Sequence, residues 1–205
     1  MPTGEMIRLK NVRLSFAALS RPKLPKGETD PLKAKYKATF LLDPSNPEHV
    51  AQIAAVKASA KAIRAAQWQD AKVQGLKPCF KLNVPKAPGS EEDEEDVLYE
   101  GWENMFSVVT SESEKPKQVN AKGIPVEEGH PGAPYSGCYV DAWITLWTQD
   151  NSFGKRINGN LLAVQFRGAG DAFSSRQGLV DGIKFDDLSG QAPAAAGAAD
   201  DDIDF

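Results

Sequence analysis

Apolar and polar residues alternate along several short segments of this chain, and alternation with a period of two predicts β-strands. The clearest case is residues 35–42, which place four apolar side chains on one face: Tyr36, Ala38, Phe40 and Leu42. Further strands are predicted at residues 7–16, 79–84, 97–110, 137–148 and 157–167. The alternation in the first of these breaks near Asn11, which predicts a β-bulge there.

One segment has the period of a helix instead. Asn46 is a favourable N-cap and Pro47 suits the first helical position. Apolar residues then recur every three or four positions, at Val50, Ile53, Val56, Ala60 and Ile63. The pattern predicts one long helix that runs to about Lys72 and is closed by Gly75.

Long loops separate these elements. Residues 21–32 and 121–136 are rich in glycine and proline, and residues 91–96 are an uninterrupted acidic run that we expect to be solvated. A chain of 205 residues fits one domain with appendages. Five or more strands, one intervening helix and long loops predict a mainly β fold, of the small Greek-key barrel type.

The predicted strand at residues 139–147 carries the most chemical information. One face is aliphatic: Val140, Ala142, Ile144 and Leu146. The other presents Tyr139, Asp141, Trp143, Thr145 and Trp147. Since the aliphatic set fills a small barrel more readily, we expect the aromatic row outside, where it could stack on unpaired bases. The alternative is that the helix or a loop covers these rings.

Charge is unevenly distributed along the chain. Residues 1–90 contain 16 Lys and Arg against 6 Asp and Glu, whereas residues 91–205 contain 8 against 22. A net charge of −4 therefore does not exclude a positive groove for nucleic acid. The basic residues that we expect to contact DNA phosphates are Arg13, Lys33, Lys35, Lys37, Lys81, Lys155, Arg156 and Arg167.

Nothing in the sequence predicts catalysis. A phosphate-binding loop is missing, because Gly154-Lys155 is followed by Arg156. Cys79 and Cys138 are too few and too far apart for a zinc ribbon, and His49 and His130 are expected at the surface. We therefore expect no enzyme activity, cofactor or metal. The sequence also has no signal peptide and no long apolar run, which predicts a cytoplasmic protein without a membrane span.

The C-terminal end combines a spacer with an acidic tip. Residues 189–199 are mostly Ala, Gly and Pro, so we expect a disordered linker. The tip carries four carboxylates and a terminal aromatic ring, in the order Asp200, Asp201, Asp202, Ile203, Asp204 and Phe205. Carboxylates beside apolar anchors suit a basic pocket on a partner protein.

This ending resembles that of replicative single-stranded DNA-binding proteins. The body resembles the phage type rather than the bacterial one, over most of residues 7–173. The similarity is carried by Asn-Val-Arg-Leu-Ser-Phe at 11–16, Lys-Tyr-Lys-Ala-Thr-Phe-Leu-Leu at 35–42, Tyr-Ser-Gly-Cys-Tyr-Val at 135–140 and Asn-Leu-Leu-Ala-Val-Gln at 160–165. The resemblance implies an OB-fold, a five-stranded Greek-key barrel, and binding of single-stranded DNA.

The sequence thus predicts a DNA-binding domain at residues 1–188 and a flexible linker and tail at 189–205. The resemblance implies protection of single-stranded DNA in phage replication and recombination, in the cytoplasm of a bacterial host. The tail is expected to recruit a polymerase, helicase or primase and to compete with DNA for the basic groove; self-association on DNA stays open. The alternative is an acidic DNA mimic or assembly factor that acts through its charged tail.

Overall fold

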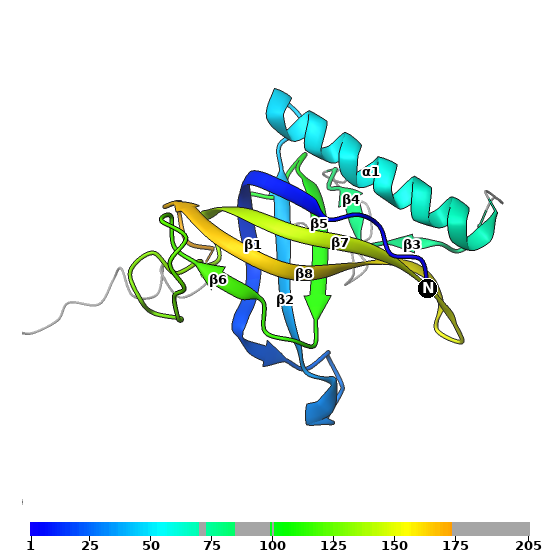
Figure 1. The fold of residues 1–205 in the computed structure, drawn as a ribbon, viewed down its shortest axis with the longest axis horizontal. Coiled ribbons are helices and arrows are strands. Elements are labelled where there is room, and N and C mark those ends of the chain that lie inside the picture. The colour runs from blue at the N-terminus through cyan, green and yellow to red at the C-terminus, as the bar shows by residue number, and fades with distance from the viewer. Residues whose placement is uncertain (70–72, 85–98, 100, 174–205) are drawn as a thin grey trace, which may run out of the picture. The chain divides into compact units, whose positions relative to one another are not determined.

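The computed structural model describes residues 1–69, 73–84, 99 and 101–173, and residues 1–173 form one compact unit. This part of the chain is mainly β with one long helix, as the sequence predicts (Figure 1). The acidic run at 91–96 and the predicted linker and tail at 189–205 lie outside the described residues.

Five long strands make the body of the sheet. They are β1 (Ile7–Lys23), β2 (Lys35–Leu42), β5 (Phe106–Glu112), β7 (Tyr139–Asn151) and β8 (Gly154–Gly168). Three strands of two or three residues are added to them: β3 (Lys77–Pro78), β4 (Phe80–Leu82) and β6 (Lys117–Val119). The helix α1 spans Pro47–Trp68, and a single 3-10 turn, η1, spans Pro31–Lys33.

The strand order is β3-β8-β7-β1-β2-β5-β4, with β6 paired to β8 outside this path. The two outermost strands, β3 and β4, are separated in the chain only by Cys79, so residues 77–82 join both ends of the sheet. β8 also comes very close to β5: a Cβ built on Gly159 would lie 2.9 Å from the Val109 carbonyl oxygen. A glycine is required there because any side chain would separate the two strands.

The predicted bulge in β1 is present at Asn11. The register between β1 and β7 shifts between Leu9 and Val12, and Asn11 has a φ of 55°. This left-handed conformation suits asparagine better than most residues. It leaves the Asn11 N–H to donate to Asp141 Oδ1 at 2.9 Å.

The helix covers part of the core with the predicted residues Ile53, Val56, Ala60 and Ile63, and it lies across one end of the strands (Figure 1). Its N-cap is Asn46, as predicted, and accepts a hydrogen bond from the Glu48 N–H. It ends at Trp68, earlier than expected, because Gln69 takes the left-handed conformation that stops a helix.

Two predictions at the start of the helix are wrong. Val50 is 50% exposed, and His49 takes its place on the buried face. His49 Nδ1 accepts a hydrogen bond from the Asp43 N–H at 2.9 Å, and Nε2 lies 3.0 Å from the Asn11 carbonyl oxygen. These two bonds tie the helix start to β1 and β2, so this histidine is not a surface residue; His130, in contrast, is exposed.

Other boundaries differ because they depend on pairing rather than on local pattern. The strand expected at 97–110 begins only at Phe106, after turns around Gly101 and Asn104. The segment between the last two strands is not a long loop: β7 and β8 remain paired up to Asn151 and Gly154. β1 continues to Lys23, into a region expected to be loop.

Candidate nucleic-acid interface

The aromatic row of β7 faces outward, as predicted. Val140, Ala142, Ile144 and Leu146 are fully buried in the core. Tyr139, Trp143 and Trp147 on the opposite face are all partly exposed. None of the three rings is fully buried, but neighbouring groups such as Arg8 and Thr3 cover the larger part of each one.

Polar neighbours hold two of these rings in place. The guanidinium carbon of Arg8 lies 4.7 Å from the ring centroid of Trp143, a cation–π distance. Trp147 Nε1 donates to Asn160 Oδ1 on β8 at 2.7 Å. Rings fixed in this way lose little entropy when a base stacks on them.

A buried carboxylate organises the arginines of this face. Asp141 is 3% exposed and accepts hydrogen bonds from Arg8 at 2.8 Å and from Arg167 at 3.0 Å, in addition to the Asn11 N–H. Burial alone would raise the pKa of Asp141, but the hydrogen bonds from Asn11, Arg8 and Arg167 outweigh it and lower the pKa. Asp141 is therefore ionised at neutral pH and holds two guanidinium groups at the outer surface.

Arg13 occupies the next position along the same surface. It is paired with Tyr139 in the β1–β7 register, and its guanidinium lies 4.5 Å from the ring centroid of Phe173. Its Nη2 donates to the Asp171 carbonyl oxygen at 3.0 Å. Arg13 also lines a hollow of about 480 Å³ that Tyr139 and Gly101 share.

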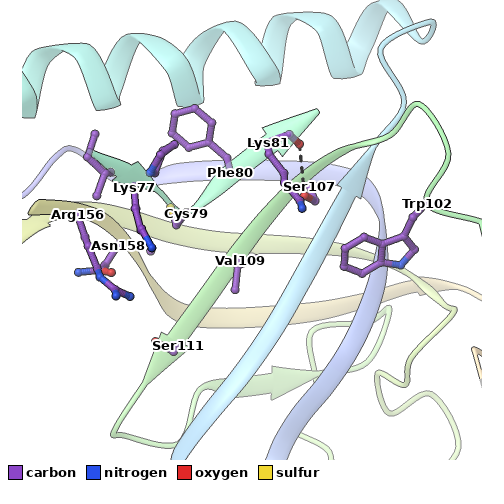
Figure 2. A pocket seen from close by; sticks show the side chains of 13 residues that line it. Lys77, Cys79, Phe80, Lys81, Trp102, Ser107, Val109, Ser111, Arg156 and Asn158 are labelled. Atoms are coloured by element: carbon purple, nitrogen blue, oxygen red, sulfur yellow. Dashed lines mark hydrogen bonds between the residues drawn. The ribbon is translucent and has the colours of Figure 1, made fainter. Parts of the chain in front are cut away.

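A basic groove of about 370 Å³ runs over β5 and β8 (Figure 2). Its charged lining residues are Lys77, Lys81 and Arg156. Figure 2 shows Lys77 and Arg156 at one end, Trp102 at the other, and side chains of β5 between them. Cations, serine hydroxyls and apolar rings in one groove are the groups that hold a single strand by its phosphates and bases.

The predicted basic residues do not all gather in one place. Lys81 and Arg156 line the groove, and Lys37 is paired with Ser111, which lines it too. Arg13 and Arg167 belong to the β7 face. The remaining predicted residues lie elsewhere in the sheet or its loops, as follows. Lys33 forms an ion pair with Glu28 at 2.7 Å, Lys155 lies 3.9 Å from Asp150, and Lys35 is paired with Lys23.

Sequence reasoning missed several residues of these surfaces. Arg8 and Lys77 were not expected, although the basic bias of residues 1–90 includes them. The role of Asp141 could not be seen because Arg8 lies 133 positions away in the chain. A cluster of Phe16, Tyr99 and Trp102 was also missed.

Burial disfavours the thiolate form of both cysteines. Burial raises the pKa of Cys79 to about 12 and that of Cys138 to about 11, so both are protonated thiols at neutral pH. Within the described ranges, no group of three or more His, Cys, Asp or Glu side chains could hold a metal ion. In the same part of the chain, no helix has the length and apolar character needed to cross a membrane.

An outward aromatic row, arginines fixed beside it and a separate basic groove on a small β-barrel are features that oligonucleotide-binding modules share. Comparison with known proteins gives the family. The profile of the Enterobacter phage Enc34 single-stranded DNA-binding protein family matches residues 5–193. The chain belongs to this family.

Individual relatives agree with this assignment. A putative protein p50 of Acyrthosiphon pisum secondary endosymbiont phage 1 is 30% identical over 183 residues, which are 89% of this chain and 94% of the relative. The solved structure of the bacteriophage Enc34 single-stranded DNA-binding protein in complex with single-stranded DNA has a TM-score of 0.66 and 26% identity, over 82% of this chain and 89% of that one. The bacteriophage T7 single-stranded DNA-binding protein gp2.5 shares the fold, with a TM-score of 0.50 and 13% identity over 95% of this chain and 98% of that one.

Proposed function

We propose that this protein binds single-stranded DNA with little sequence preference and protects it during phage DNA replication and recombination in the host cytoplasm. The outward row of Tyr139, Trp143 and Trp147, with Arg8 and Arg167 fixed beside it, is the observation that carries the proposal. Stacking on a ring contributes about 1–3 kcal/mol per base whatever the base, so such a surface needs no sequence readout. Family membership supports a binding module over an enzyme.

Sequence independence is tested with labelled oligonucleotides of equal length. Fluorescence anisotropy should give affinities for oligo(dT), oligo(dC) and a mixed sequence that agree within about tenfold, since backbone and stacking contacts dominate. Much weaker binding to every single strand than to duplex DNA would contradict the proposal. Capture of a basic partner protein without any DNA binding would favour the DNA-mimic alternative.

The acidic end, residues 200–205, is proposed to recruit replication proteins such as a polymerase, helicase or primase. Its spacer of about a dozen residues gives a root-mean-square reach of roughly 20 Å, and tethering then gives an effective concentration near the millimolar range. At that concentration four carboxylates compete with DNA for a basic surface, more strongly at low salt. DNA binding would in turn release the tail for a partner.

Two variants separate the roles of the tail. Deletion of residues 200–205 should raise affinity for single strands, and more so for weakly bound duplex DNA. Phe205→Ala should abolish capture of the partner and leave DNA affinity unchanged, because it removes the apolar anchor but none of the side-chain carboxylates. Equal DNA binding by the full and truncated chains across a salt series would show that the tail does not compete.

A further inference from the structure

β1 contains a second irregularity, at Phe16. The register between β1 and β2 shifts between Ser15 and Ala18, and Phe16 has a φ of 47°. For a bulky residue this left-handed conformation is strained. Glycine would adopt it without strain. β-Bulges frequently redirect a side chain, and here the side chain is an aromatic ring.

The redirected ring joins a cluster with Tyr99 and Trp102. The Phe16 centroid lies 4.8 Å from that of Tyr99 and 5.5 Å from that of Trp102, both edge to face. Trp102 is 8% exposed, whereas Phe16 is 51% and Tyr99 47% exposed. One buried ring thus supports two rings whose outer halves meet solvent. These edge-to-face contacts stabilise the cluster and so offset the strain at Phe16.

This cluster connects the surfaces described above. Trp102 lines the basic groove with Lys81. Its neighbour Gly101 lines the hollow of Arg13 and Tyr139, and a Cβ on Gly101 would lie 3.2 Å from the Phe173 ring. The cluster therefore lies between the two basic surfaces of the barrel.

We propose that Phe16 and Tyr99 are a base-stacking site for single-stranded nucleic acid, with Trp102 as its rigid support. The site takes one or two unpaired bases of any identity, and the flanking cations hold the adjoining phosphates. This inference rests on the proposed function and adds a site to the β7 row.

The decisive variant is Phe16→Gly, because it removes the ring and the backbone strain together. Affinity for a labelled oligo(dT) should fall about 5- to 150-fold, the equivalent of one lost stacking contact. The melting temperature should stay equal to that of the wild type or rise. Phe16→Leu, which keeps an apolar side chain without a π-face, should lose affinity in the same range, and Phe16→Tyr should retain it.

Each outcome has a definite reading. Wild-type affinity in Phe16→Gly overturns the stacking site and leaves the proposed function intact. Wild-type affinity in Phe16→Leu, with a lower melting temperature in Phe16→Gly, shows that Phe16 only packs against Trp102 and also overturns it. A wild-type chain that binds no single-stranded DNA overturns the proposed function and this inference with it.

Discussion

Replacing the buried carboxylate of Asp141 is the most informative test of how the β7 face is built. Asp141→Ala removes the acceptor of the Asn11 N–H and of two arginines. An orphaned buried donor costs about 1–3 kcal/mol. The arginine side chains are 45% and 52% exposed, so water re-solvates them and the full penalty of about 3–5 kcal/mol for a broken buried pair is not reached.

We therefore expect Asp141→Ala to lower the free energy of unfolding by about 2–4 kcal/mol. For a domain of this size that is a fall of about 4–16 °C in melting temperature. Urea unfolding at neutral pH measures it. Glu128→Ala is the control, because its ion pair with Arg21 is fully on the surface and should contribute less than about 1 kcal/mol.

The pH dependence gives an independent check. The folded-state pKa of Asp141 lies below its unfolded value of 3.8, so its contribution is complete well above pH 3.8 and is lost as the pH falls through the folded-state pKa. The difference between wild type and Asp141→Ala should be constant from pH 7 to about pH 5 and shrink in stronger acid. A difference below about 0.5 kcal/mol at pH 7, or one that grows in acid, would refute the reasoning.

Two further substitutions test the barrel and the aromatic row. Gly159→Ala should lose about 1–3 kcal/mol of stability in thermal unfolding, because its Cβ would meet the Val109 carbonyl oxygen. Gly168→Ala is the control and should be neutral, because the space around Gly168 is open. Equal melting temperatures of the two variants would contradict this account of how β5 and β8 meet. Trp143→Ala should weaken single-stranded DNA binding by about 1–3 kcal/mol and lose less stability than the roughly 3–5 kcal/mol of a buried tryptophan. Calorimetry and anisotropy on the same variant separate the two, and a loss of stability alone would show that the ring is core.

Features set by neighbouring residues could be predicted from the sequence. β2 occupies the predicted residues 35–42, because alternation of apolar and polar residues predicts a strand, although Thr39 and Leu41 on its second face are buried as well. The outward face of Trp143 follows from the aliphatic side chains on either side of it. The helix start at Asn46 and the bulge at Asn11 are likewise local, since a capping side chain and a break in period are visible in a few residues.

Features set by pairing between distant segments could not be predicted. The sequence predicts one short strand at residues 79–84, yet Lys77–Pro78 pair with β8 and Phe80–Leu82 pair with β5. Tyr99 and Trp102 meet Phe16 only because the turn before β5 packs against β1. His49 was assigned to the surface because its hydrogen-bond partners belong to β1 and to the end of β2, which the helix period does not reveal.

The central claim, that this barrel holds single strands by phosphate contacts and stacking, is tested most directly by one titration. Oligo(dT) is added to the full-length protein at several salt concentrations while the intrinsic fluorescence of its four tryptophans is followed. The account predicts strong quenching and an affinity that falls with salt, with a log–log slope of about −0.7 per neutralised phosphate. Binding without quenching, binding insensitive to salt, or no binding would contradict it.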